Sequence, residues 1–228
     1  MKERVAVIYL HGLGSSPSSP KATMFAGHFG AKGQRVLVPD LALPNLSRLS
    51  VDQALHRVVE VLNECGSWGP MVVIGSSFGG FLAVRAITGL QTSVAAKVEG
   101  LVLLAPVLYP WHPHSPIVSQ AMEDEWLSSG SFPIEEGSTG QLVPVHFRFL
   151  EELKRHAGEI GSVDVRTLVV HGLRDERVPH QHSVEFVGRT PSAKLISLDE
   201  DHQMFGNPHG LVTVVDTFVQ SLKLDDGP

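Results

Sequence analysis

Short runs of consecutive apolar residues recur along the chain, and the segments between them repeat apolar residues with the period of a helix. The runs are continuously hydrophobic rather than alternating with polar residues, which is typical of strands covered on both faces in a parallel sheet. A turn follows each run. The predicted strands are Val5–Leu10, Arg35–Pro39, Met71–Gly75, Gly100–Ala105, Arg166–Gly172 and Ala193–Leu198.

Two of the intervening segments carry signals for where a helix begins and ends. In the first, Ser50 and Gln53 have the spacing of a capping box, and Gly66 suits the position just after the helix. In the second, Asn207 is the expected N-cap and Pro208 the first helical residue. Each segment gathers apolar residues on one face. They are Val51, Ala54, Leu55, Val58, Leu62 and Cys65 in the first, and Leu211, Val214, Val215, Phe218 and Leu222 in the second.

The alternation of strands and helices predicts a single α/β domain over residues 1–228, built on a doubly wound, mainly parallel sheet of about six strands with right-handed crossovers. Residues 106–161 break the rhythm, because they show no strand–helix repeat over more length than a short connection needs. We interpret them as an insertion, or cap, over one end of the sheet. Residues 224–228 are expected to fray.

Composition narrows the classes of partner and compartment. The 228 residues carry a formal net charge of −6, and lysine and arginine are scattered singly, which argues against nucleic acid or an anionic membrane as partner. Cys65 is the single cysteine, so no internal disulfide forms. The apolar run VAVIYL is too short for a signal-sequence core or a membrane span. We therefore expect a cytoplasmic protein with no membrane span, and nothing in the pattern selects an oligomeric state.

The stretch GSSFG, residues 75–79, has the pattern G-x-S-x-G. A buried strand runs into it and an apolar helical segment leaves it, which is the strand–turn–helix setting of a nucleophile elbow. The central Ser77 is then the predicted nucleophile, and Ser76 is not. The flanking Gly75 and Gly79 suit a turn whose chains pass close together. A merely structural Gly/Ser turn is the alternative.

A serine nucleophile needs a general base that is itself oriented by a carboxylate. In this type of sheet the order along the chain is serine, acid, histidine. Asp175 follows the fifth predicted strand and His202 follows the sixth. Both therefore lie at carboxyl ends of strands, the edge where open α/β sheets build their sites.

Neighbouring residues are weaker candidates for these roles. His180 and His182 follow the predicted acid too closely and are expected to begin a helix. His171 lies within a strand and is interpreted as a packed core histidine. The acidic residues 199–201 could orient His202, but they are its sequence neighbours and are interpreted as solvated loop charges.

Two main-chain N–H groups are needed to hold the negative charge that develops on the substrate oxygen. Phe78 is expected to supply one, because it follows the nucleophile at a helix N-terminus. Leu13, in the loop LHGLGSSPSS after the first strand, is expected to supply the other. His11 in the same loop is interpreted as a structural hydrogen-bonding residue.

The segments IYLHGLGSSP, IGSSFGG, VVHGLRDERVP and DEDHQM together resemble the α/β-hydrolase superfamily, and YLHGLGSSPSSPKA in particular resembles the small YqiA-type esterases. The resemblance covers residues 5–106 and 166–222. The chain departs from larger members by lacking their two leading strands, and from the smallest esterases by the longer segment 106–161. The resemblance implies a serine hydrolase. Its implied site residues are Ser77, Asp175 and His202, with Leu13 and Phe78 as oxyanion donors.

The inserted segment is expected to hang over the nucleophile. Its aromatic residues could wall a substrate pocket, since such sites are mostly apolar, or they could only anchor the insertion. Those residues are Tyr109, Trp111, Trp126 and Phe132. His112 and His114 lack an evident third ligand, so we expect no metal there.

The sequence thus predicts a cofactor-free serine hydrolase that cleaves a small carboxylic ester through an acyl-enzyme intermediate. A thioesterase, lipase or peptidase would use the same residues. A hydroxynitrile lyase or cofactor-free peroxidase would reuse them for other chemistry, and a non-catalytic binding protein could keep the fold.

Overall fold

The computed structural model describes residues 5–89, 92–158, 160 and 163–222; the predicted frayed tail and the end of the predicted insertion at Gly161 lie outside these ranges. Six parallel strands form the central sheet in the order β2-β1-β3-β4-β7-β8. The doubly wound parallel sheet predicted from the apolar runs is therefore confirmed. The strands are β1 (Ala6–Leu10), β2 (Arg35–Leu37), β3 (Met71–Ser76), β4 (Val98–Leu104), β7 (Thr167–Gly172) and β8 (Ala193–Leu198).

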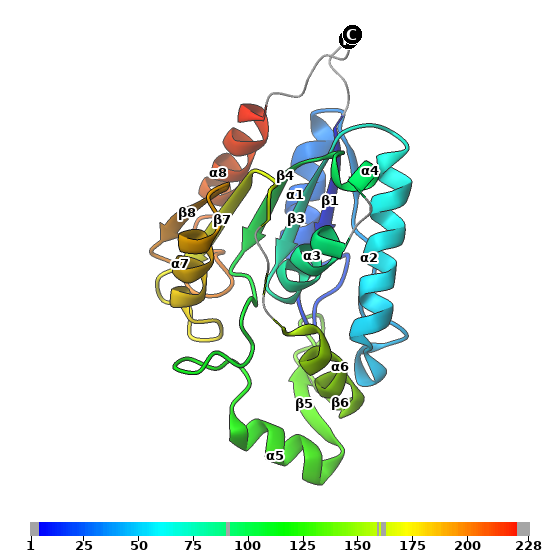
Figure 1. Ribbon diagram of the computed structural model, residues 1–228, viewed down its shortest axis with the longest axis vertical. Helices are drawn as coiled ribbons and strands as arrows, with labels where there is room; N and C mark the ends of the chain where they lie inside the picture. The colour runs from blue at the N-terminus through cyan, green and yellow to red at the C-terminus, as the bar shows by residue number, and fades with distance from the viewer. Residues whose placement is uncertain (1–4, 90–91, 159, 161–162, 223–228) are drawn as a thin grey trace.

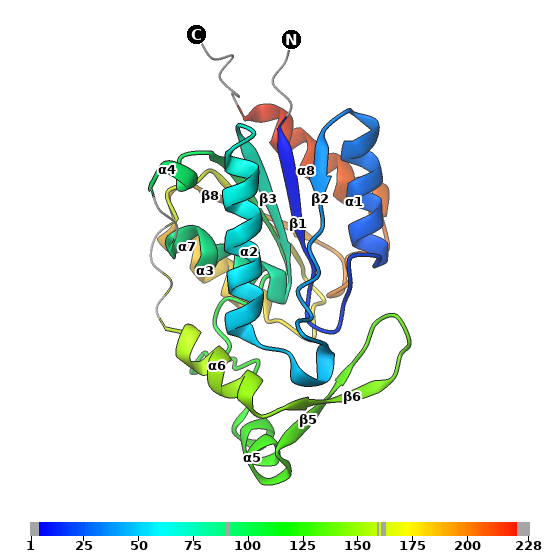
Figure 2. The ribbon, with the colours of Figure 1, turned by 90° about the vertical axis from the view of Figure 1, so that its right-hand side faces the viewer.

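Helices cover both faces of the sheet, because successive strand residues point to opposite faces and both sets are apolar. On one face, Val7 and Tyr9 of β1 pack with Phe25 and Phe29 of α1 and with Leu211 of α8. The opposite face packs against α2, α3 and α7. Figure 2 shows α1 and α8 on one side of the sheet and α2 and α3 on the other. The helices are α1 (Pro20–Ala31), α2 (Val51–Gly66), α3 (Phe78–Gly89), α7 (His180–Arg189) and α8 (Pro208–Ser221), with the short α4 (Thr92–Ala95) and the 3₁₀ turn η1 (Leu46–Arg48).

The predicted helix starts are found in the structure. The hydroxyl oxygen of Ser50 accepts a hydrogen bond from the main-chain N–H of Gln53 at 3.2 Å, and Asn207 caps α8 in the same way. The second half of the predicted capping box is replaced, since the N–H of Ser50 donates to the carbonyl oxygen of Leu43. At the other end, α2 runs through Gly66 rather than stopping before it.

The segment after β4 forms structure that the sequence pattern did not predict. It contains α5 (Gln120–Ser129), the strands β5 (Ser131–Glu135) and β6 (Leu142–His146), and α6 (Arg148–His156). The two strands pair with each other as an antiparallel hairpin, with Pro133 opposite Pro144. Short, half-exposed strands that each contain a proline leave no continuous apolar run to detect. Figure 1 shows these elements gathered beyond the carboxyl ends of the main strands.

Two kinds of contact tie this segment to the sheet. Its buried residues Trp126, Val145 and Phe149 belong to the same apolar cluster as the strands. Glu152 of α6, with a side chain only 1% exposed, accepts a hydrogen bond from the Ser50 hydroxyl at 2.8 Å. It also accepts one from the N–H of Asp52, so a carboxylate from α6 caps the positive end of α2.

Further ion pairs join α6 to the same end of α2. Arg155 and His156 both contact the carboxylate of Asp52, at 2.9 Å and 2.7 Å.

Within the part of the chain that the structure describes, no helix has both the length and the apolar character needed to cross a membrane.

Shared burial predicts that the inserted segment unfolds together with the sheet. Leu150 of α6 is 2% exposed, whereas Leu127 of α5 is 59% exposed. We expect Leu150→Ala to lower the free energy of unfolding by about 2–5 kcal/mol, the usual cost of emptying a core leucine site. The matched Leu127→Ala is expected to change it by less than about 0.5 kcal/mol.

Urea unfolding, followed by both fluorescence and circular dichroism, measures the two values. A separate transition for the segment, or equal effects of the two substitutions, would contradict a common core.

Candidate active site

Ser77 occupies the sharp turn between β3 and α3. Its φ angle is 54°, in the left-handed region that side chains other than glycine seldom adopt. The flanking glycines are required by space: a Cβ on Gly75 would lie 2.7 Å from the Gly79 carbonyl oxygen, and one on Gly79 would overlap the carbonyl oxygen of Leu10. Only this tight packing of β1, β3 and α3 holds the serine at the end of the strand.

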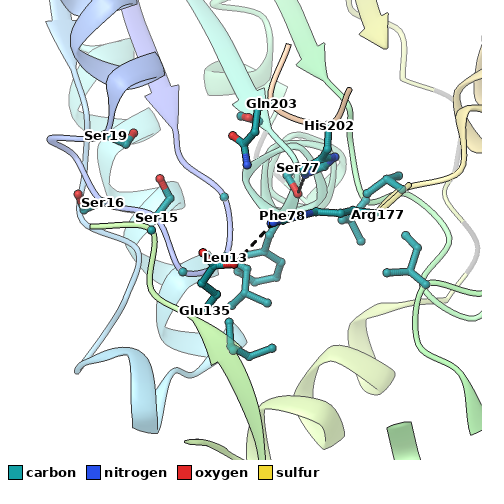
Figure 3. Close-up of a pocket in the computed structure, with 18 of the residues that line it drawn as sticks. Leu13, Ser15, Ser16, Ser19, Ser77, Phe78, Glu135, Arg177, His202 and Gln203 are labelled. Atoms are coloured by element: carbon teal, nitrogen blue, oxygen red, sulfur yellow. Dashed lines mark hydrogen bonds and ion pairs between the residues drawn. The ribbon is translucent and has the colours of Figure 1, made fainter. Parts of the chain in front are cut away.

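Ser77, His202 and Asp175 come together from three separate loops. The hydroxyl oxygen of Ser77 lies 3.1 Å from Nε2 of His202, and Nδ1 of His202 lies 2.7 Å from Oδ2 of Asp175. A carboxylate only accepts hydrogen bonds, so Nδ1 carries the proton and Nε2 is left to accept one from the serine. Figure 3 shows the side chains of Ser77 and His202 facing each other.

The carboxylate of Asp175 is fully buried and has four hydrogen-bond donors. Its Oδ1 accepts from the N–H groups of Arg177 and Val178 at 2.9 Å and 2.8 Å, and its Oδ2 accepts from His171 and His202. Burial alone would raise the pKa of Asp175, but the hydrogen bonds from the two histidines and from Val178 outweigh it, so the pKa lies well below its ordinary value. Asp175 therefore stays ionised.

His171 also belongs to this network, although its position within a strand predicted only a packed core histidine. It is fully buried, as expected, but its Nε2 lies 3.1 Å from Oδ2 of Asp175 and 3.0 Å from the carbonyl oxygen of Val178. Because both partners only accept, Nε2 must carry the proton, and Nδ1 accepts from the Ser183 hydroxyl at 2.7 Å. In the sequence, this contact could have been expected from the position of His171 near the end of a predicted strand, four residues before the predicted acid Asp175.

Leu13 and Phe78 both lie beside the serine. Phe78 begins α3, and Leu13 follows Gly12, where an added Cβ would lie 3.3 Å from Cβ of Ser77. Among the residues that the structure describes, neither N–H donates to a side chain or to a loop carbonyl. His11 is 2% exposed and its Nε2 accepts from the N–H of Leu41 at 3.1 Å, which ties this loop to the segment after β2.

A cavity of about 790 Å³ opens beside Ser77 and His202. One wall is apolar and comes largely from the inserted segment. It includes Val107, Pro110, Ile117, Val118, Met122, Trp126 and Phe149. The other wall is polar and comes largely from the loop after β1 and the start of α1. It includes Ser15, Ser16, Ser18, Ser19 and Lys21, with Gln203 from the histidine loop.

Of the four aromatic residues that could wall the pocket, Trp126 lines this cavity, but Tyr109, Trp111 and Phe132 do not. The ring of Tyr109 packs against His182 instead, at 5.7 Å between centroids. The indole N–H of Trp111 donates to the carboxylate of Glu123. Both residues turn away from the cavity because polar partners on α7 and α5 hold them.

The other histidines and acidic residues lie in structural contacts. His180 and His182 are on α7, where they bond Ser197 and the main chain of Ser115. Asp201 accepts hydrogen bonds from the N–H groups of two residues in the loop that carries His202. Within the described residues, no group of three or more histidine, cysteine or acidic side chains is placed to hold a metal ion.

Comparison with known proteins places the chain among α/β hydrolases. The palmitoyl-protein thioesterase ABHD10, mitochondrial, of Mus musculus is 26% identical over 189 residues, which are 78% of this chain and 61% of the mouse protein. This chain thus matches less than two thirds of that relative's length. The solved structure of the mouse protein has a TM-score of 0.77 and 23% identity, covering 97% of this chain and 92% of that one.

Other solved structures share the fold at lower identity. A protein of Agrobacterium vitis S4 has a TM-score of 0.80 and 20% identity, covering 96% of this chain and 89% of that one. A monoacylglycerol lipase of Paleococcus ferrophilus has a TM-score of 0.73 and 16% identity, covering 95% and 94%. The model of the family described as Uncharacterised protein family (UPF0227) matches residues 6–218. The chain therefore has the α/β-hydrolase fold and belongs to the family UPF0227.

Proposed function

We propose that this protein is a serine hydrolase that cleaves carboxylic esters or thioesters, with Ser77 as nucleophile, His202 as general base and Asp175 as the residue that orients it. The observation that carries the proposal is the continuous contact from Ser77 through His202 to Asp175, at 3.1 Å and 2.7 Å. A serine hydrolase requires a hydroxyl, an imidazole and a carboxylate in this order and with this tautomer of the imidazole, whereas a binding protein requires none of the three.

The proposed cycle has two halves. The Ser77 oxygen attacks the substrate carbonyl carbon while its proton passes to Nε2 of His202, and the N–H groups of Leu13 and Phe78 hold the oxyanion. The carbon–oxygen or carbon–sulfur bond then breaks, and His202 gives its proton to the departing alcohol or thiol. Water adds to the acyl-enzyme in the same way and releases the acid and free Ser77.

Thioesters are the second substrate class in this proposal, and two observations favour them. The mouse relative is named as a palmitoyl-protein thioesterase, and one wall of the cavity here is lined by apolar residues that suit an acyl chain. Lipase or peptidase activity would use the same residues. The cytoplasmic location expected from the sequence stays a prediction, whereas the name of the mouse relative places that protein in mitochondria.

The first test is covalent labelling of the serine. We expect a fluorophosphonate to add once to the intact protein and not to Ser77→Ala, which should also lose ester and thioester hydrolysis by at least about a thousandfold. Ser76→Ala is the matched control, because Ser76 is 4% exposed and its hydroxyl is bonded to Tyr9. Intact-mass spectrometry reads the adduct. Labelling that survives in Ser77→Ala would refute the nucleophile, and no labelling of the folded wild type would favour a binding protein.

The second test concerns the carboxylate. We expect Asp175→Asn to lower kcat by about 10³–10⁴-fold with little change in KM, because an amide N–H facing Nδ1 would favour the wrong tautomer of His202. Asp164→Asn, an exposed position before β7, is the matched control and should behave as wild type. Steady-state hydrolysis of one ester by both variants gives the comparison. A loss confined to KM would show that Asp175 only shapes the pocket.

A further inference from the structure

The polar wall of the cavity contains a cation with no direct partner. Lys21 lines the cavity, and its ammonium group has no ion pair and no hydrogen bond with the described part of the chain. Burial lowers the pKa of Lys21 to about 8, while Asp175 and Asp201 act in the opposite direction from beyond contact distance and Arg177 adds to the lowering. Lys21 is half-buried, so its ammonium group is left to interact with solvent or with an anionic ligand in the cavity.

The other charges of the cavity wall cancel each other. Only three of the residues that line it are formally charged with histidine neutral, and these are Lys21, Arg177 and Glu135. Arg177 and Glu135 form an ion pair at 3.7 Å, which bridges the acid loop and the inserted hairpin. The formally charged residues of the cavity wall therefore sum to one positive charge, in a chain whose formal net charge is −6. The ionised Asp175 lies behind His202 and does not line the wall.

Lys21 also lies where the main chain adds positive potential. It is the second residue of the twelve-residue helix α1, whose N-cap Ser19 makes no side-chain cap and whose first turn has no acidic residue. Residues 18–21 all line the cavity. The partial positive charge of this helix end therefore acts on the same wall as the ammonium group.

The surroundings of Lys21 show which half of a substrate it would meet. The acidic groups that influence it, Asp175 and Asp201, come from the loop that orients His202 and the loop that carries it. His202 gives its proton to the leaving group, so that group must lie on the same side of Ser77. Figure 3 shows Gln203 beside His202 above Ser77, and Ser15, Ser16 and Ser19 farther to the left. The apolar wall is then left for the acyl group.

We propose that the substrate carries a carboxylate on its alcohol or thiol half, and that Lys21 is the residue that binds this carboxylate. The inference rests on the proposed function and names the class of its leaving group. One excess charge matches a carboxylate better than a phosphate monoester, which carries more negative charge. The serine hydroxyls of the loop after β1 supply further donors around the same group.

The test uses three butyrate esters of one phenol ring that differ only at the meta position. The esters are those of 3-hydroxybenzoate, methyl 3-hydroxybenzoate and 3-hydroxyphenyl phosphate. For each enzyme variant the readout is the ratio of kcat/KM on a charged ester to kcat/KM on the neutral methyl ester. This ratio, compared between variants, removes differences in the intrinsic reactivity of the esters. The variants are Lys21→Met, Lys21→Arg and the control Lys194→Met, an exposed lysine of β8 outside the cavity wall.

We expect Lys21→Met to lower the carboxylate-to-methyl-ester ratio about tenfold, the usual worth of one charge-assisted hydrogen bond. Lys21→Arg should keep most of the ratio, and Lys194→Met should leave it as in wild type. An unchanged ratio in Lys21→Met, or an equal loss on both esters, would overturn the inference. A stronger dependence of the phosphate ester on Lys21 would overturn the choice of carboxylate.

Failure of this inference can be told apart from failure of the proposed function. An enzyme that cleaves the neutral ester but shows no Lys21-dependent ratio refutes only the leaving-group assignment. An enzyme that cleaves none of these esters and no acyl thioester refutes the proposed function. In that case calorimetric binding of 3-hydroxybenzoate to wild type and Lys21→Met still decides the role of Lys21: weaker binding to Lys21→Met supports it, and equal or absent binding overturns it.

The ionisation of Lys21 gives an independent prediction. Burial lowers the pKa of Lys21 to about 8. Asp175 and Asp201 partly oppose this lowering, and Arg177 adds to it. Because only the charged form attracts a carboxylate, the carboxylate-to-methyl-ester ratio should be highest below pH 8 and fall as the pH rises through this value. The Lys21→Arg variant should keep its ratio across the same range, since arginine stays protonated. A ratio that falls equally in both variants would contradict the role of Lys21.

Discussion

The close approach of β1, β3 and α3 around Gly75 and Gly79 is the constraint on which the rest of the site depends. No side chain fits at either glycine, and Ser77 between them is held at a φ of 54°. Such a conformation costs of the order of 1–3 kcal/mol, and it persists because the surrounding structure leaves no alternative. Here that structure is a strand and a helix whose residues are almost all buried. The position of the proposed nucleophile is therefore decided by the core of the domain.

The two charges near Ser77, those of Asp175 and Lys21, differ in their hydrogen-bond partners. Asp175 has a donor for each lone pair that faces the protein, and these donors include His171 from within the sheet. Of these donors, His202 is the one that also contacts Ser77. Lys21, which lines the cavity, has no ion pair and no hydrogen bond with the described side chains. The charge of Asp175 is bound by groups of the protein, and that of Lys21 is left for a ligand.

The sequence was sufficient for those features that follow from local pattern and topology. Continuous apolar runs predicted the parallel sheet, and because parallel strands end at one edge, Ser77, Asp175 and His202 could be expected to meet there. It was insufficient for features that depend on packing between distant segments. The hairpin of the inserted segment has exposed, proline-containing strands, and the partners that turn Trp111 away from the cavity lie on other elements. The contact of His171 with Asp175 and the burial of Lys21 likewise exist only in the folded chain.

The carboxylate of Glu152 has a consequence for which parts of the cavity wall can vary. Its hydrogen bonds with Ser50 and Asp52 join α6 to the first turn of α2. The elements before it, α5 and the β5–β6 hairpin, contribute Met122, Trp126 and Ile134 to the cavity, and among the described residues neither element has a carboxylate that caps α2. Substitutions within residues 120–146 would therefore reshape the apolar lining of the cavity while the turn at Ser77 and the hydrogen bonds of Asp175 keep their own supports.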